Sequence, residues 1–82
     1  ECIIGKNPNA VDVVINFNKM ISRVHCKIST QKNMYYLTDL GSANGTYVNQ
    51  RKLVPNQSTP IKDGDFIRLA NSDFKFKVGG GM

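Results

Sequence analysis

Apolar residues in this chain come in short runs that Gly, Pro, Asn or Asp interrupts every few residues, and this pattern limits the possible folds more than any other feature. In places the runs become a strict alternation, as where Val24, Cys26 and Ile28 alternate with polar residues. Alternation turns one set of side chains toward a core and the other set toward solvent. The pattern therefore predicts an all-β domain.

The predicted strands are short, and turn signals separate them at close intervals. Lys32-Asn33 is interpreted as the tight turn of a hairpin, Asp63-Gly64 as a second turn, and residues 49–51 as the link between two short paired strands. Such a series indicates a β-sandwich or a small barrel. We expect strands over residues 2–4, 11–15, 24–29, 34–39, 46–48, 52–54 and 66–69, and a last strand whose Phe74, Phe76 and Val78 face the core.

The length of 82 residues allows one domain with a modest core. We assign the domain to residues 1–78 and a flexible, glycine-rich tail to residues 79–82. The chain begins with Glu1 and shows no signal peptide, so we expect it to be a piece of a longer cytoplasmic protein. No apolar stretch approaches the roughly 20 residues of a membrane span. Cys2 and Cys26 lie in apolar runs and are interpreted as buried thiols.

The chain carries a formal net charge of +5, from 11 basic and 6 acidic residues. A positive balance favours an anionic partner, such as nucleic acid, an acidic membrane face or a phosphorylated peptide. The basic residues are scattered rather than gathered in one block. The choice among these partners therefore depends on the motifs.

Four polar side chains on predicted loops suit the binding of a phosphate group. A phosphate monoester carries a charge of about −1.5 to −2 and needs several converging donors. Ser22 offers a hydroxyl, Arg23 a guanidinium, Asn44 an amide and Lys6 an ammonium. Each is also explained without a ligand, because serine caps turns, exposed Lys and Arg are ordinary surface residues, and Asn-Gly is a common hairpin turn.

The same chain holds the ingredients of a hydrolytic site, which we disfavour. Ser22, His25, Cys26 and Asp39 supply the residue types of a triad or of a thiol–imidazole pair. However, adjacent strand residues such as His25 and Cys26 point to opposite faces, and a glycine-rich nucleophile elbow is missing from the sequence. One His and two separated Cys do not make a tetrahedral metal site. We therefore predict no enzyme activity, no metal and no cofactor.

Six motifs follow one another along almost the whole chain: Gly5-Lys6, residues 22–25, residues 36–42, residues 44–46, Val48-Asn49 and residues 63–67. In their order and spacing they together resemble the forkhead-associated (FHA) domain. The resemblance implies a β-sandwich of two twisted, mainly antiparallel sheets, whose loops at one end bind phosphothreonine peptides.

The resemblance also implies a role for each site residue. Ser22 and Lys6 would contact the phosphate, Arg23 would reach the phosphate or the peptide, and Asn44 would hold the peptide backbone. Ala43 belongs to the same contact set. The residues that would shape and brace the loops are Gly5, His25, Gly45 and Asn49.

Three positions depart from the family pattern. Lys6 stands where the family usually has Arg, which keeps the charge but loses the two-pronged guanidinium. Ala43 stands where a hydroxyl residue often assists the phosphate. Gln50-Arg51 replaces the usual glycine after Asn49. Family members also begin with a strand upstream of the one that ends at Gly5, and its absence would leave an exposed sheet edge.

The predicted function is a non-enzymatic module that recognises phosphothreonine peptides within a larger signalling or regulatory protein, as a monomeric domain with neither membrane nor nucleic-acid partners. A first alternative is an FHA-like scaffold that binds its partner independently of phosphate, as Lys6 and Ala43 suggest. A second is a basic β-module that binds nucleic acid. It ranks lower because, apart from Tyr35 and Tyr47, exposed strand positions offer no aromatic stacking platform.

Overall fold

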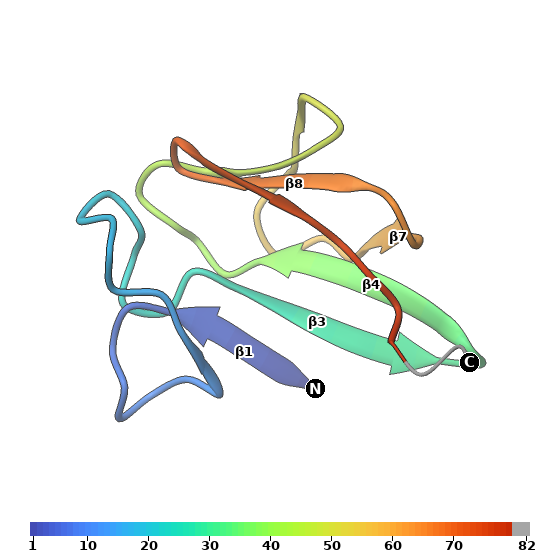
Figure 1. The fold of residues 1–82 in the computed structure, drawn as a ribbon, viewed down its shortest axis with the longest axis horizontal. Coiled ribbons are helices and arrows are strands. Elements are labelled where there is room, and N and C mark those ends of the chain that lie inside the picture. Colours follow the sequence, from blue (N-terminus) through green and yellow to red (C-terminus); the bar gives the residue numbers. More distant parts are fainter. Residues whose placement is uncertain (80–82) are drawn as a thin grey trace.

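The structure is a computed structural model that describes residues 1–79, and in this part of the chain it is all-β. Residues 80–82, most of the predicted tail, lie outside the described residues. The strands form two layers (Figure 1). One sheet has the order β2 (Val13–Val14), β1 (Cys2–Gly5), β3 (Cys26–Gln31), β4 (Met34–Asp39) and β7 (Thr59–Ile61). The other has the order β6 (Arg51–Lys52), β5 (Thr46–Val48), β8 (Phe66–Leu69) and β9 (Ser72–Lys75).

Every strand pair among these is antiparallel except β1 and β2. The predicted sandwich of two mainly antiparallel sheets is therefore confirmed. At one end of the sandwich lie the loops after β1, before β3 and after β4, and the short β8–β9 connection (Figure 1). The tight turns between β3 and β4 and between β5 and β6 lie at the opposite end. The first end holds most of the predicted site residues.

The β3–β4 hairpin forms as predicted. Gln31 pairs with Met34, so Lys32 and Asn33 alone make the turn. Their φ angles are 52° and 65°, the left-handed pair that a two-residue type I′ turn requires. This turn matches the right-handed twist of the two strands it joins.

The β5–β6 turn is one residue shorter than predicted. Val48 pairs with Arg51, so Asn49 and Gln50 form a second two-residue turn, with φ angles of 49° and 72°. The strand after it ends at Lys52 rather than at residue 54. Leu53 then turns into the core, and its amide donates to the Thr46 carbonyl at 2.8 Å.

Three expectations about individual strands are wrong. The strand predicted over residues 11–15 is only Val13–Val14, because β2 is an edge strand that pairs with β1 alone. The alternation fails at the start of β3, where Val24 is 37% exposed and His25 is fully buried. Val78 is 41% exposed instead of facing the core, since β9 ends at Lys75. Phe74 and Phe76 do pack against the core as expected.

β7 contains Pro60 and lies in a segment for which no strand was predicted. Proline cannot donate to a strand ladder, so it is tolerated only at an edge or a bulge. β7 is the edge strand of the five-stranded sheet, and Pro60 lies opposite Tyr36 of β4. The edge position explains why a proline segment still forms a strand.

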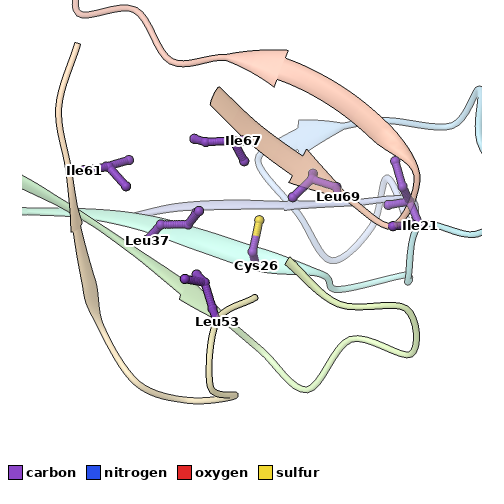
Figure 2. Close-up of a cluster of buried hydrophobic side chains, with 8 residues drawn as sticks. Ile21, Cys26, Leu37, Leu53, Ile61, Ile67 and Leu69 are labelled. Atoms are coloured by element: carbon purple, nitrogen blue, oxygen red, sulfur yellow. The ribbon is translucent and has the colours of Figure 1, made fainter. Parts of the chain in front are cut away.

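The core lies between the two sheets (Figure 2). Burial raises the pKa of the Cys26 thiol to about 12, with a smaller contribution from the nearby Asp39 carboxylate, so this thiol stays neutral. Cys2 is only half-buried, contrary to the prediction, and both cysteines are free. The buried hydrophobic residues are Ile21, Cys26, Leu37, Leu53, Ile61, Ile67, Leu69 and Ala70.

Candidate functional site

The loop after β1 crosses the loop before β3 in direct contact at Gly5. A Cβ atom on Gly5 would overlap the Arg23 carbonyl oxygen and lie 2.8 Å from the Arg23 carbonyl carbon. The Lys6 amide donates to the carbonyls of Ser22 and Arg23, each at 3.0 Å, and the Asn7 amide donates to Arg23 at 3.1 Å. The missing side chain of Gly5 therefore allows the backbone contact that joins the two loops.

Ser22 connects the loop before β3 to the loop after β4. Its Oγ accepts a hydrogen bond from the Ala43 amide at 2.9 Å, and its own amide donates to His25 Nδ1 at 3.0 Å. The side chain is half-buried. Among the residues described, the Ser22 hydroxyl proton has no acceptor, so it remains available to an anion.

Asn44 holds the same two loops together from the other side. Its Nδ2 donates to the Met20 carbonyl at 2.8 Å, which uses one of the two amide protons. An asparagine side chain offers two donors and one acceptor oxygen. The exposed amide of Asn44 thus keeps a donor and an acceptor for a peptide backbone.

His25 lies beneath these loops and is fully buried. Its Nδ1 accepts from the Ser22 amide, which fixes the ring proton on Nε2. Nε2 then donates to the Gly45 carbonyl at 2.9 Å. Gly45 itself has a φ of 89°, a conformation in which an L side chain is strained. His25 thus bridges the loop before β3 and the loop after β4 with both ring nitrogens.

Asp39 organises the loop after β4 and was not predicted as a bracing residue. It is almost fully buried and accepts hydrogen bonds from the hydroxyls of Ser42 and Thr46 and from the amides of Gly41 and Ser42. Burial raises the pKa of Asp39, but these hydrogen bonds outweigh it and hold the pKa below its ordinary value. The available signal was an Asp followed by Gly and Ser at the end of a strand, a pattern typical of side-chain-capped turns.

The two candidate cations, Arg23 and Lys6, differ in whether the charged group already has a hydrogen-bond partner. Arg23 is exposed, and its guanidinium has no hydrogen-bond or ion-pair partner within residues 1–79. It borders a small hollow lined by Asn7, Ser22, Arg23 and Val24. Lys6 is half-buried, and its Nζ donates to the Lys19 carbonyl at 3.2 Å. Ala43 is exposed and contributes its backbone amide to Ser22, but no side-chain donor.

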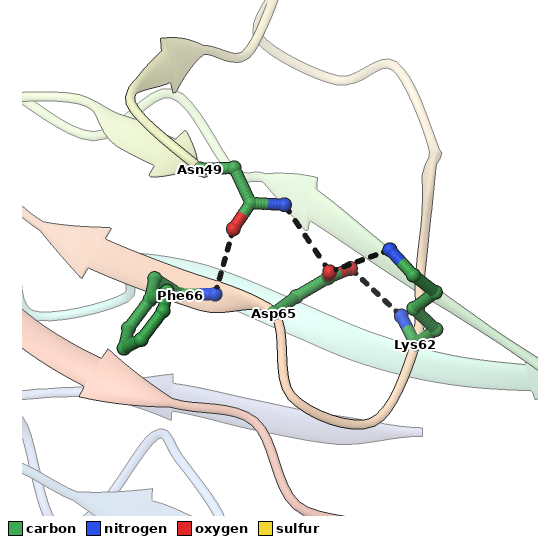
Figure 3. Close-up of polar contacts among 4 residues, drawn as sticks. All are labelled: Asn49, Lys62, Asp65 and Phe66. Carbon is green, nitrogen blue, oxygen red and sulfur yellow. Dashed lines mark hydrogen bonds and ion pairs between the residues drawn. The ribbon is translucent and has the colours of Figure 1, made fainter.

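Asn49 is the one predicted loop-bracing residue that the structure does not bring to this end. It lies at the far end of β5 from Gly45 and joins the β5–β6 turn to β8 (Figure 3). Its Oδ1 accepts from the Phe66 amide at 2.9 Å and its Nδ2 donates to Asp65 at 3.1 Å. Hydrogen bonds from Lys62, with a smaller one from Asn49, hold the pKa of Asp65 below its ordinary value.

Residues 1–79 show neither a cluster of metal-binding side chains nor a helix that could span a membrane. Their His, Cys, Asp and Glu side chains form no group of three or more that could hold a metal ion. The same residues contain no helix that is long and apolar enough to cross a membrane.

The chain matches known proteins over most of its length. It is 38% identical to Protein FraH of Nostoc over 64 residues, which cover 74% of this chain and 22% of FraH. It also resembles solved structures of EmbR from Mycobacterium tuberculosis with a low-affinity phosphopeptide and of the MEK1 FHA domain with the HOP1 pThr318 peptide. For EmbR the TM-score is 0.84 at 28% identity, covering 99% of this chain and 20% of EmbR. For MEK1 it is 0.78 at 28%, covering 96% and 80%.

The chain thus spans about a fifth of the length of FraH. The family model described as "FHA domain" matches residues 2–70, which include the crossing at Gly5 and both loops that Ser22 and Asn44 connect. The match extends through β8 and so covers strands of both sheets. The chain belongs to the FHA domain family.

Proposed function

We propose that this domain recognises phosphothreonine in a partner protein, and that the loops joined by Ser22 and Asn44 hold the phosphorylated residue. The observation that carries the proposal is the set of unused donors at one end of the sandwich: the Ser22 hydroxyl, one Asn44 amide proton and the Arg23 guanidinium. The phosphopeptide complexes of EmbR and of the MEK1 FHA domain support it.

The donors divide into two groups according to the part of the phosphopeptide that each would bind. The Ser22 hydroxyl and the Arg23 guanidinium suit phosphate oxygens, because a charge-assisted hydrogen bond contributes roughly 1.5–3 kcal/mol. The Asn44 amide suits the peptide backbone, since it offers a donor and an acceptor together. Lys6 would add a second positive charge by exchanging its bond to the Lys19 carbonyl for one to the phosphate.

Loops that are already held in place favour binding with little change in backbone conformation. Asp39 and His25 hold the two loops through six hydrogen bonds. Asp39 accepts one from Gly41, two from Ser42 and one from Thr46. His25 accepts one from the Ser22 amide and donates one to the Gly45 carbonyl. Little entropy is then lost in these loops when a peptide binds. Phosphate dependence follows because, within residues 1–79, the free donors of Ser22, Arg23 and Asn44 contact no carboxylate.

A screen of degenerate peptides around a fixed phosphothreonine tests the proposal. We expect binding to the phosphorylated pool, and a loss of about tenfold or more in the Arg23→Ala and Ser22→Ala variants, since each removes a charge-assisted bond. Lys77→Ala, at an exposed position beyond β9, is the matched control and should bind as the wild type does. Equal retention of phosphorylated and unphosphorylated pools would contradict the proposal.

We propose binding rather than catalysis. Both ring nitrogens of His25 are engaged, with the Ser22 amide and the Gly45 carbonyl, so the ring has no free nitrogen to act as a general base. The raised pKa of Cys26 keeps that thiol protonated and unreactive. Neither residue is therefore suited to activate a nucleophile.

A phosphate-independent scaffold remains the second candidate, and the bond from Lys6 to the Lys19 carbonyl favours it. That bond holds the ammonium without an anion, and Ala43 adds no side-chain donor. The Ser22→Ala and Arg23→Ala variants separate the two functions. Unchanged binding of a partner by both variants would favour the scaffold.

The domain is proposed to serve within a larger regulatory protein in the cytoplasm, as a monomer. The short span relative to FraH supports a modular role. The two free cysteines suit a reducing compartment. In protein isolated under non-reducing conditions, we expect a maleimide reagent to label both thiols. Cys26 should react only after the domain is unfolded.

A further inference from the structure

The outer face of the four-stranded sheet carries a second set of side chains suited to binding. One row runs straight across the sheet, because Tyr47 pairs with both Lys52 and Arg68, and Arg68 pairs with Asp73. A second row holds Phe66 opposite Lys75. We call these six residues the outer-face patch: Tyr47, Lys52, Phe66, Arg68, Asp73 and Lys75.

The patch has an apolar centre that is open to solvent. Phe66 is 60% exposed, although the Lys75 ammonium lies 5.6 Å from the centre of its ring. A hollow of about 730 Å³ opens beside it, lined by residues of the patch and of the β5–β6 turn. Its lining residues are Tyr47, Asn49, Gln50, Phe66, Ile67, Arg68 and Asp73.

The free charge of the patch is positive. Arg68 donates to Asp73 through Nε at 2.8 Å and through a second guanidinium nitrogen at 3.2 Å, so these two charges offset each other. Lys52 and Lys75 then remain without an acidic partner among the described residues. They lie on the two outer strands of the sheet, β6 and β9, with the aromatic rings between them.

The patch is continuous with the peptide-binding end. A Cβ atom on Gly45 would lie 3.0 Å from Lys52 Cε and 3.3 Å from Tyr47 Cε1. The side chains of Lys52 and Tyr47 therefore reach the loop that carries Asn44. A polypeptide that leaves the loop end along this side of the sandwich would meet Lys52 first and then the apolar centre.

We propose that the outer-face patch binds an acidic segment of the partner protein, with one large apolar side chain seated in the hollow beside Phe66 and acidic residues facing Lys52 and Lys75. Binding energy at protein interfaces concentrates in buried aromatic and apolar anchors, while complementary charges around them give specificity. Nucleic acid fits less well, because it needs a line of free cations along its backbone, and Arg68 is already paired with Asp73.

This inference goes beyond phosphothreonine binding and does not need it. If both sites bind the same partner, the acidic segment and the phosphothreonine act together, and the second contact becomes intramolecular. A partner with only one of the two features would then bind more weakly than one with both.

The test is a titration of the whole chain with an unphosphorylated synthetic peptide of Asp and Glu residues around a single Leu. The backbone amide NMR signals of the chain are monitored during the titration. We expect shifts at residues 47, 52, 66–68 and 73–75, and none at Ser22, Arg23 or Asn44. A Phe66→Ala, Lys75→Ala double variant should bind at least tenfold more weakly. Met34→Ala, at a 50% exposed apolar position on the other sheet, is the control.

Three results would overturn the inference: an absence of shifts, shifts confined to the loop end, or outer-face shifts with a single-stranded oligonucleotide but not with the peptide. The amide spectrum of the double variant shows directly whether it is folded, and the wild-type shifts decide the question in any case. Because the peptide carries no phosphate, failure of phosphothreonine binding would leave this test intact.

Discussion

At the scale of single residues, the candidate site depends on groups that hold its loops in place. Gly5 is the clearest case, since the crossing of two loops occupies the space of its missing side chain. A motif of Gly followed by Lys predicts a turn, but it does not predict that the loop before β3 lies in direct contact with this turn. The FHA resemblance predicts that Gly5 shapes the loops, but the contact through which it does so is visible only when both loops are in place.

Replacing Gly5 with alanine should destabilise the domain by about 2–3 kcal/mol, because the new methyl group overlaps the Arg23 carbonyl and forces the loops apart. The free energy of unfolding from urea denaturation measures this. Gly79→Ala is the control, since a Cβ atom there has no neighbour within 4 Å, and it should change stability little. Equal stability of the two variants would show that the crossing is looser than described.

Asp39→Asn should lower stability most near neutral pH. The pKa of Asp39 lies below its ordinary value of 3.8 in the folded state, so its carboxylate contributes stability above that pH, and the contribution disappears as the pH falls through the lowered pKa. The expected difference from wild type is about 1–3 kcal/mol at neutral pH, because a buried charged acceptor is lost. Urea denaturation from about pH 7 to pH 2 measures it. A difference that does not shrink on acidification would refute this assignment.

At the scale of elements, two tight turns show what the sequence pattern could and could not predict. Lys32-Asn33 was predicted because clear strand patterns flank it on both sides. The β5–β6 turn was placed one residue too long, since strands of two and three residues give too little alternation to fix a register. The inversion at Val24 and His25 has a different cause: the loop after β4, which lies far along the chain, contacts His25 and buries it.

Gln50→Gly should stabilise the domain by about 0.5–1 kcal/mol. Gln50 has a φ of 72°, a left-handed conformation that costs an L residue more than glycine, and this gain exceeds the entropy lost by glycine on folding. Thermal or urea unfolding gives the change. Gln31→Gly, at the last residue of β3 and paired with Met34, is the matched control and should be destabilised instead. Destabilisation of both variants would contradict the turn geometry.

At the scale of the whole molecule, most of the fold could be predicted from sequence, and so could the grouping of candidate site residues at one end of it, but the contacts between loops could not. The FHA-like motifs brought Ser22, Arg23 and Asn44 to one end of a sandwich. They did not show that Asn49 lies at the other end, or that Asp39 holds the loop after β4. The contacts of Asn49 join residues far apart in sequence, where a local pattern carries no signal. Those of Asp39 are local, and the Gly and Ser that follow it were the available signal for them.

The net charge of +5 predicts that association with a phosphopeptide depends on salt. Raising the ionic strength from about 0.01 M to about 0.15 M shortens the screening length from about 30 Å to about 8 Å, which weakens attraction at a distance. Stopped-flow measurements should show a slower association rate and a nearly constant dissociation rate. A salt effect confined to dissociation would place the charge effect in the bound contacts rather than in steering.

The most direct test of the central claim is calorimetric titration of the domain with a matched pair of peptides that differ only in the phosphate on one threonine, chosen from the degenerate screen. We predict measurable binding of the phosphorylated peptide alone, and its loss in Arg23→Ala with the fold intact. Equal affinity for both peptides, or full binding by Arg23→Ala and Ser22→Ala, would contradict phosphothreonine recognition at this site.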